Sequence, residues 1–239
     1  MGKYLLVGAS SGLGRLCASK FADRGDEVYV IAREKKRDTT GHFFRCDLSD
    51  LKSVNKNIKQ ISCEIGPLTG ACFFQRLRVK NKDESTSEEL AVSVLSTEVI
   101  LKNILQNLDN ESDHPFVFVS SVNSRYISSE MTLGYHISKA SLDILAKYFA
   151  AKFGSKLARF NTVNPGTFIK PERTDWYETN RSELTRLSNF LPRKKMNTAE
   201  NISDLILFLT DQKSIGINGQ NLIIDGGASL GWIESKVGE

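Results

Sequence analysis

The sequence predicts a three-layer, doubly wound α/β fold, with a sheet of about seven parallel strands and helices on both faces. Two local observations predict it. An apolar run at residues 4–7 leads into a glycine-rich turn and a helical pattern, and a second strand pattern follows at residues 27–32. In addition, 239 residues with 40% apolar content can bury one large core. Since no Pro/Gly/Ser-rich linker or internal repeat divides the chain, we expect residues 1–239 to form one domain.

The glycine-rich turn runs from Gly8 to Gly14 with the sequence GASSGLG. Strand, glycine turn and helix start is the order in which such a turn binds a dinucleotide. The first glycine permits the tight turn, the second lets a pyrophosphate approach the backbone, and the third lets helix and strand pack closely. Free N–H groups at the helix start then face the phosphates. The residues expected at this phosphate site are Gly8, Ser10, Ser11, Gly12, Leu13 and Gly14.

The end of the second strand carries information about the cofactor. An acidic residue there would bind the adenosine ribose hydroxyls of NAD, whereas an arginine accommodates the 2′-phosphate of NADP. Here Ala32 stands at the acidic position and Arg33 follows it. The sequence therefore predicts NADP(H), with Arg33 beside the adenine and paired with the phosphate. The alternative is a solvated basic turn, because more cations follow Arg33.

A helical pattern over residues 135–153 carries Tyr135 and Lys139. Their side chains lie on one helix face, where the ammonium favours the phenolate form. Tyr135 is therefore a candidate general acid or base. Because this spacing also arises by chance in many helices, a solvated helix face is the alternative.

Together these segments resemble the short-chain dehydrogenase/reductase family, whose turn reads TGxxxGxG and whose catalytic helix carries YxxxK. The resemblance covers nearly the whole chain. Residues 46–48 resemble the family's adenine-side aspartate and its neighbours, and residues 116–121 resemble the strand that delivers a catalytic serine. Residues 161–166 resemble the N-A-V-x-P-G segment beside the nicotinamide, and residues 216–227 resemble the closing strand and its D-G-G turn.

The resemblance implies a Rossmann fold and an NADP(H)-dependent oxidoreductase that moves hydride between the nicotinamide and a carbonyl or secondary alcohol. Tyr135 would transfer the proton, and Lys139 would lower the pKa of Tyr135 and bind the nicotinamide ribose. Ser121 would hold the reacting oxygen, with Ser120 as the alternative. The cofactor contacts implied beyond the glycine turn are Arg33, Asp47, Leu48, Phe74, Tyr135, Lys139, Pro165, Gly166 and Phe168.

Two departures from the family pattern stand out. The family's N-N-A-G segment aligns with residues 73–76, which read FFQR. We expect Phe73 and Phe74 to be core aromatics, while Arg76 or Arg78 could bind a substrate carboxylate or phosphate.

The second departure concerns the relay asparagine of the fourth helix, whose place is taken by Ser93. Because serine has no amide, slow turnover or replacement of this role by another group is expected. We still count Ser93 with the catalytic residues.

The segment at about 166–195 is expected to form a substrate lid, and it is rich in polar side chains. A steroid or fatty acyl chain would favour a more continuous apolar lining. The lid therefore favours a polar substrate, such as a sugar, a nucleotide sugar or another anionic metabolite. The alternative is a solvated lid that is polar whatever it covers.

Composition excludes several other classes. The four cysteines and three histidines show no metal-ligand spacing, so reduced cysteines, no metal and a cytoplasmic location are expected. The first strand begins within a few residues of Met1, which argues against a signal peptide, and no apolar run reaches membrane-spanning length. The net charge of +4 is not gathered in a long basic tract, so we expect no nucleic-acid partner.

Several functional alternatives stay open. The two departures favour a cofactor-binding regulatory protein with little or no catalysis, whereas an intact Tyr135, Lys139 and serine favour an enzyme. An epimerase or dehydratase is a third possibility, but the chain is short for the substrate domain of such relatives. In relatives the fourth and fifth helices, here near residues 88–108 and 135–153, pair across a twofold axis, so a homodimer or homotetramer is expected.

Overall fold

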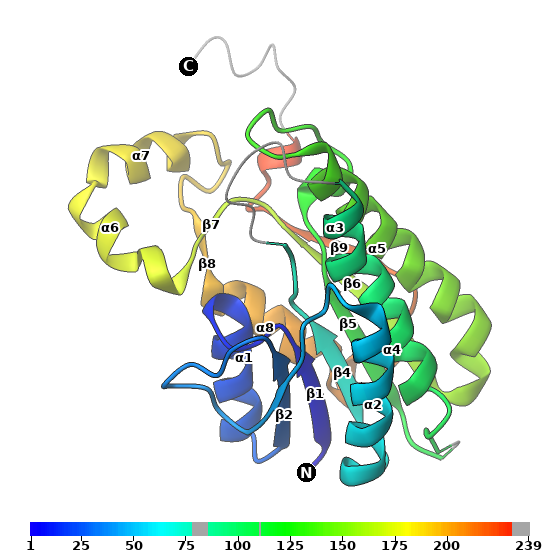
Figure 1. Ribbon diagram of the computed structural model, residues 1–239. Helices are drawn as coiled ribbons and strands as arrows, with labels where there is room; N and C mark the ends of the chain where they lie inside the picture. The colour runs from blue at the N-terminus through cyan, green and yellow to red at the C-terminus, as the bar shows by residue number, and fades with distance from the viewer. Residues whose placement is uncertain (78–85, 110, 231–239) are drawn as a thin grey trace.

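The computed structural model describes residues 1–77, 86–109 and 111–230, and its centre is a sheet of seven parallel strands (Figure 1). The spatial order is β3-β2-β1-β4-β5-β6-β9, so the direction of winding reverses between β1 and β4. This confirms the predicted doubly wound fold. The strands are β1 (Lys3–Val7), β2 (Glu27–Ala32), β3 (His42–Arg45), β4 (Gly70–Phe73), β5 (His114–Val119), β6 (Ala158–Pro165) and β9 (Asn221–Ile224).

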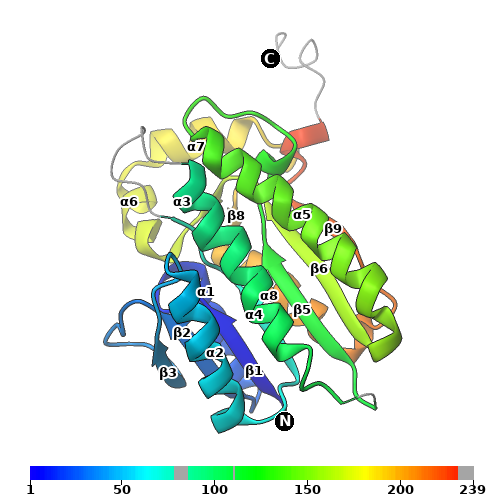
Figure 2. The same cartoon turned by 45° about the vertical axis from the view of Figure 1, so that its right-hand side comes forward.

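Helices cover both faces of the sheet because the side chains of a strand alternate between two faces. Leu5 and Val7 of β1 belong to a core shared with α2 (Leu51–Ile65), α4 (Ser96–Ile104) and α5 (Leu133–Phe153). Figure 2 shows these three helices in front of the sheet. Tyr4 and Leu6 belong to a second core, shared with α1 (Gly12–Asp23) and α8 (Ala199–Leu209).

The predicted helix near residues 88–108 is present in three consecutive parts. It begins as α3 (Thr86–Leu90), passes through the π-helical turn η1 (Ala91–Leu95) and continues as α4. A π-helical turn inside a longer helix often marks a functional site. The helix with Tyr135 and Lys139 is uninterrupted from Leu133 to Phe153.

The expected lid carries its own secondary structure, which the polar sequence did not reveal. Strand β7 (Phe168–Ile169) pairs in parallel with β8 (Asn197–Thr198), and α6 (Thr174–Thr179) and α7 (Arg181–Asn189) lie between them. Figure 1 shows α6 and α7 projecting to one side of the sheet above α1. The remaining short helices are η2 (Val122–Ser124), η3 (Gly154–Lys156), η4 (Pro171–Arg173), η5 (Gln212–Ser214) and η6 (Ala228–Leu230).

None of the helices in the described ranges combines the length and the apolar character needed to cross a membrane.

Candidate active site

A cavity of about 800 Å³ opens at the carboxyl ends of the central strands. Its wall includes the residues that directly follow β1, β4 and β5, namely Gly8, Phe74 and Ser120. This is the place where the strand order reverses and where open α/β sheets bind their ligands. The cavity brings together all the residues predicted for the cofactor, which are Gly8, Ser10, Ser11, Gly12, Leu13, Gly14, Arg33, Asp47, Leu48, Phe74, Tyr135, Lys139, Pro165, Gly166 and Phe168.

The surroundings of the three glycines explain why each position of the turn requires a glycine. A Cβ atom on Gly8 would lie 2.7 Å from the Gln75 backbone nitrogen, and one on Gly14 would lie 2.6 Å from Ala9 Cα. Both glycines therefore permit close backbone packing. Gly12 has a φ of +56°, and the nearest atoms to a Cβ there would be the Glu172 carboxylate oxygens at 3.4 Å.

The glycine turn fits the pyrophosphate of a dinucleotide. The backbone at Gly12 adopts the left-handed conformation and borders the cavity without a side chain. The Ser11 side chain makes no capping bond to α1, so the first-turn N–H groups lack that partner. Such groups bind phosphate oxygens through hydrogen bonds and the helix dipole.

Arg33 and Asp47 line the end of the cavity that the sequence predicts for the adenine. The backbone N–H of Ser49 holds the pKa of Asp47 below its usual value, against the effect of burial, and the Ser49 hydroxyl and the Arg33 charge act in the same direction. Arg33 is exposed, whereas Ala32 before it is buried in β2. The cationic group at this end is thus accessible to a ligand.

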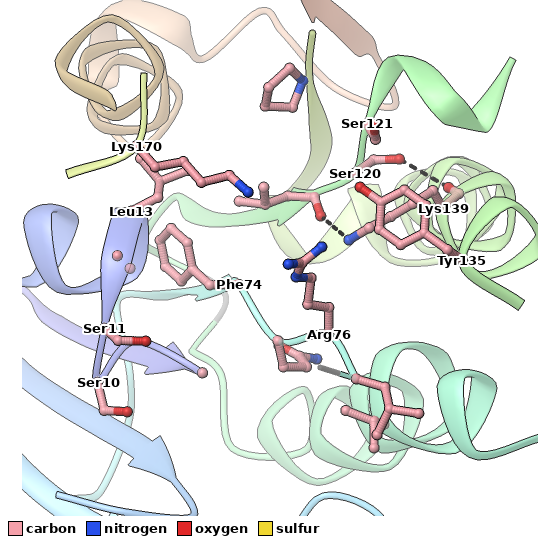
Figure 3. Close-up of a pocket in the computed structure, with 18 of the residues that line it drawn as sticks. Ser10, Ser11, Leu13, Phe74, Arg76, Ser120, Ser121, Tyr135, Lys139 and Lys170 are labelled. Atoms are coloured by element: carbon pink, nitrogen blue, oxygen red, sulfur yellow. Dashed lines mark hydrogen bonds between the residues drawn. The ribbon is translucent and has the colours of Figure 1, made fainter. Parts of the chain in front are cut away.

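Tyr135 and Lys139 line the opposite part of the cavity, as Figure 3 shows. Thr132 caps α5 by accepting a hydrogen bond from the Tyr135 backbone N–H, at 3.2 Å, which fixes the start of the helix. The Lys139 Nζ lies 5.6 Å from the centroid of the Tyr135 ring and donates to the Val119 carbonyl oxygen at 2.8 Å.

Burial changes the proton affinity of Lys139, whose side chain is enclosed in the protein. Desolvation lowers the Lys139 pKa from 10.5 to about 8, and the nearby Arg76 charge acts in the same direction. The carboxylates of Glu89 and Asp143 oppose this effect. The Lys139 pKa therefore lies only slightly above neutral pH, so the ammonium is still mostly charged at neutral pH and loses its proton soon above it.

The two candidate serines differ in their hydrogen bonds. Ser120 Oγ donates to the backbone carbonyl oxygen of Lys139 at 3.0 Å. Ser121 Oγ accepts from the Asn123 backbone N–H at 3.1 Å, and within the described part of the chain no acceptor for its proton is found. Both line the cavity, but Ser121 is the one with a proton left to donate to a ligand oxygen.

The residues of the FFQR segment lie partly in the core and partly at the cavity. Phe73 is a core aromatic as expected, with 2% of its surface exposed. Phe74 is half-buried; it packs against the second core and also lines the cavity. Arg76 is exposed, and Figure 3 shows its guanidinium pointing into the cavity toward Lys139. Arg78 lies outside the described residues.

Ser93 is fully buried but is not among the residues that line the cavity. Its hydroxyl donates to Glu89 Oε1 at 2.6 Å, and Glu89 is likewise not among the lining residues. Sequence reasoning missed Glu89 because it closes a polar segment that reads as solvated surface. The available signal was its position four residues before Ser93, on the same helix face.

The described residues contain no group of three or more His, Cys, Asp or Glu side chains that could hold a metal ion. Cys17, Cys46 and Cys72 are buried thiols and Cys63 is an exposed one.

Comparison with known proteins gives consistent results. The family model described as enoyl-(acyl carrier protein) reductase matches residues 8–229. The glucose 1-dehydrogenase of Gluconobacter oxydans is 26% identical, with 95% of this chain and 92% of that protein covered. The L-xylulose reductase of Mus musculus is also 26% identical, with 94% and 95% covered.

Solved structures agree on the fold. The Thermoplasma acidophilum aldohexose dehydrogenase superposes with a TM-score of 0.85 at 21% identity, covering 97% of this chain and 95% of that one. A short chain dehydrogenase family protein from Francisella tularensis superposes with a TM-score of 0.80 at 21% identity, covering 97% and 100%. With the matched family model, these findings show that the chain belongs to the short-chain dehydrogenase/reductase family, whose members are oxidoreductases that use NAD or NADP.

Proposed function

We propose that the protein is an NADP(H)-dependent oxidoreductase that transfers hydride between the nicotinamide and a carbonyl or secondary alcohol. The observation that carries the proposal is the placement of Tyr135, Lys139 and Ser121 at one end of a cavity whose other end is a glycine turn. A purely binding role would not require these three side chains.

The bound cofactor supplies or accepts the hydride. The chain's own residues position the reactants and move the proton. The glycine turn and the start of α1 hold the pyrophosphate, and Lys139 binds the nicotinamide ribose. The Ser121 hydroxyl donates to the reacting oxygen, and the Tyr135 hydroxyl gives that oxygen a proton in reduction or takes one in oxidation.

The preference for NADP(H) rests on Arg33. An exposed guanidinium at the adenine end can form paired hydrogen bonds with the 2′-phosphate, and Ala32 leaves no carboxylate at the position that would bind the ribose hydroxyls of NAD. Glu34 also lines the cavity, but its carboxylate is paired with Lys36 at 2.7 Å.

A polar or anionic substrate, such as a sugar or a nucleotide sugar, suits the rest of the cavity. Charged side chains reach the wall from two directions, with Arg76 after β4 and Lys170, Glu172 and Arg173 from the lid. Such groups orient polar ligands through hydrogen bonds and charge. Two relatives are named for glucose and xylulose, which is consistent with a carbohydrate.

The experiment for this function is a turnover assay with NADPH against a panel of keto sugars and small carbonyl compounds. We expect reduction of at least one polar substrate by the wild type and loss of turnover in Tyr135→Phe.

A cofactor-binding regulatory protein is the second candidate, favoured by the FFQR segment and by the position of Ser93 outside the cavity lining. Tight NADPH binding without turnover across the panel would select it.

We also infer a homodimer or homotetramer that uses the face of α5. Ile144 is 63% exposed and Tyr148 is 55% exposed, and Ile137 on the same helix is exposed as well. Apolar side chains gathered in this way are typical of an interaction surface.

We propose a cytoplasmic location, because buried thiols that stay reduced fit the reducing environment of the cytoplasm.

A further inference from the structure

Helix α3 packs tightly against α5 next to the proposed proton donor. A Cβ atom on Gly134 would lie 3.0 Å from Thr86 Cα and 3.2 Å from Glu89 Cβ, so the glycine before Tyr135 allows this close approach. Glu89 thereby enters the interior, where only 2% of its surface is exposed.

The hydrogen bonds of Glu89 satisfy only one of its two carboxylate oxygens. Oε1 accepts from Ser93 Oγ at 2.6 Å, from the Leu77 backbone N–H at 3.4 Å and from Ser138 Oγ at 3.5 Å. Oε2 is buried and has no hydrogen-bond partner among the residues that the structure describes. A buried carboxylate with an unsatisfied oxygen is costly, so a folded protein retains one mainly where a nearby cation or a function compensates.

The nearby cation is Lys139, which is 3% exposed. Three charged groups act on its ammonium: Glu89 from α3, Asp143 from α5 and Arg76 from the segment after β4. Glu89 has the largest effect of the three. Asp143 is already engaged, because both of its oxygens accept from Asn164 Nδ2, at 3.0 and 2.9 Å.

Glu89 forms no ion pair with Lys139, whose Nζ donates to the Val119 carbonyl oxygen. It is nevertheless buried beside this lysine, because it accepts from the hydroxyl of Ser138, the residue before Lys139, and its Oε2 is left without a partner among the described residues. Glu89 therefore acts on the Lys139 ammonium through its charge rather than through direct contact.

We propose that Glu89 is a positioning residue of the reaction, whose buried carboxylate keeps Lys139 in its charged form against the cost of burial. Ser93 acts one step further away, because its hydroxyl fixes the carboxylate. Ser93, which takes the place of the family's relay asparagine, thus acts on Lys139 through the charge of Glu89 rather than through an amide. This inference rests on the proposed function, since a charged Lys139 matters to catalysis only where Tyr135 transfers a proton.

The direct test is a 13C NMR titration of the protein labelled at the lysine side-chain carbons, with Lys139→Arg to assign the signal. Glu89→Gln keeps the side-chain volume and removes the charge. We expect the Lys139 midpoint to fall by about one pH unit in this variant, because an opposite charge is lost nearby. Glu98→Gln removes a partly exposed carboxylate on α4, which pairs with Lys102, and should leave the midpoint unchanged.

A Lys139 midpoint equal to that of the wild type in Glu89→Gln would overturn the inference. Where Glu89→Gln does not fold, Glu89→Asp replaces it, because its carboxylate is withdrawn by one methylene. The midpoint is then expected below the wild-type value, and an unchanged midpoint would again contradict us.

A second readout separates this inference from the proposed function. In the pH profile of kcat/KM, Glu89→Gln should move the alkaline decline to lower pH by about the NMR shift, with partial recovery in Glu89→Asp. An unchanged profile in an active enzyme refutes the role of Glu89. A wild type without any turnover refutes the proposed function, while the NMR titration still decides whether Glu89 controls the charge of Lys139.

Discussion

At the scale of single residues, the chemistry depends on the environment of a few side chains. The sequence could predict Tyr135, Lys139 and the two serines because their motifs are local, and the cavity contains all four. It could not predict that Ser120 donates to the Lys139 backbone or that Glu89 is buried, because both depend on how β5 and α3 pack against α5. Residue spacing carries no direct information on such packing.

The serine assignment leads to a paired comparison. Ser121→Ala removes the hydroxyl whose proton is available to the substrate oxygen, so we expect kcat to fall by roughly 100-fold. Ser120→Ala removes a bond to the Lys139 carbonyl oxygen and should cost much less in kcat. Steady-state kinetics on both variants provide the measurement, and the reverse order of losses would place the role on Ser120.

The burial of Lys139 gives a pH dependence. Because its pKa is lowered to about 8, the ammonium is charged below that pH and loses its proton above it. We therefore expect kcat/KM for carbonyl reduction to be sustained below pH 8 and to decline above it. A profile that stays flat up to pH 10, close to the ordinary lysine value, would show that the charge of Lys139 is not required.

At the scale of elements, strands and the glycine turn were predictable because each is a local pattern, and β2 has the predicted bounds. The segment at about 166–195 was predictable only as a polar segment. Its helices α6 and α7 have no buried face that would impose a clear apolar period, since Ser188 is the only buried residue within them.

One contact of the segment at 166–195 with the glycine turn should affect cofactor affinity. The Glu172 carboxylate lies beside Gly12, at the turn where the pyrophosphate is proposed to bind, so like charges must separate when the cofactor enters. Glu172→Gln should tighten NADPH binding by about two- to fivefold, the effect of one charge near a helix start. Glu178→Gln in α6, which does not line the cavity, should leave the dissociation constant unchanged. Equal affinities for all three proteins would exclude this effect.

At the scale of the whole molecule, the parallel sheet brings segments from along the chain to one edge, so the order of motifs was enough to place the cavity. Other contacts that join distant segments cannot be read from the sequence pattern. Arg159 at the start of β6 is 4% exposed and binds both oxygens of Asp113, at 2.7 and 2.8 Å. It also donates to the Ser214 carbonyl oxygen at 3.0 Å, which ties β6 to the segment before β9.

Breaking this buried pair should destabilise the fold. Arg159→Met leaves the Asp113 carboxylate buried without its cation, and we expect the free energy of unfolding in urea to fall by about 3–5 kcal/mol. Arg186→Met breaks an exposed pair with Glu183 and is the matched control, for which no measurable change is expected. A similar small effect for both variants would mean that the buried pair contributes little.

The measurement that tests the central claim most directly is a titration of the purified protein with NADPH and with NADH, followed by cofactor fluorescence. We predict tight binding of NADPH, weak binding of NADH, and loss of this preference in Arg33→Ala. If neither cofactor binds, the residues from Phe74 to Arg76 close the site, and the assignment of an NADP(H)-dependent oxidoreductase is contradicted.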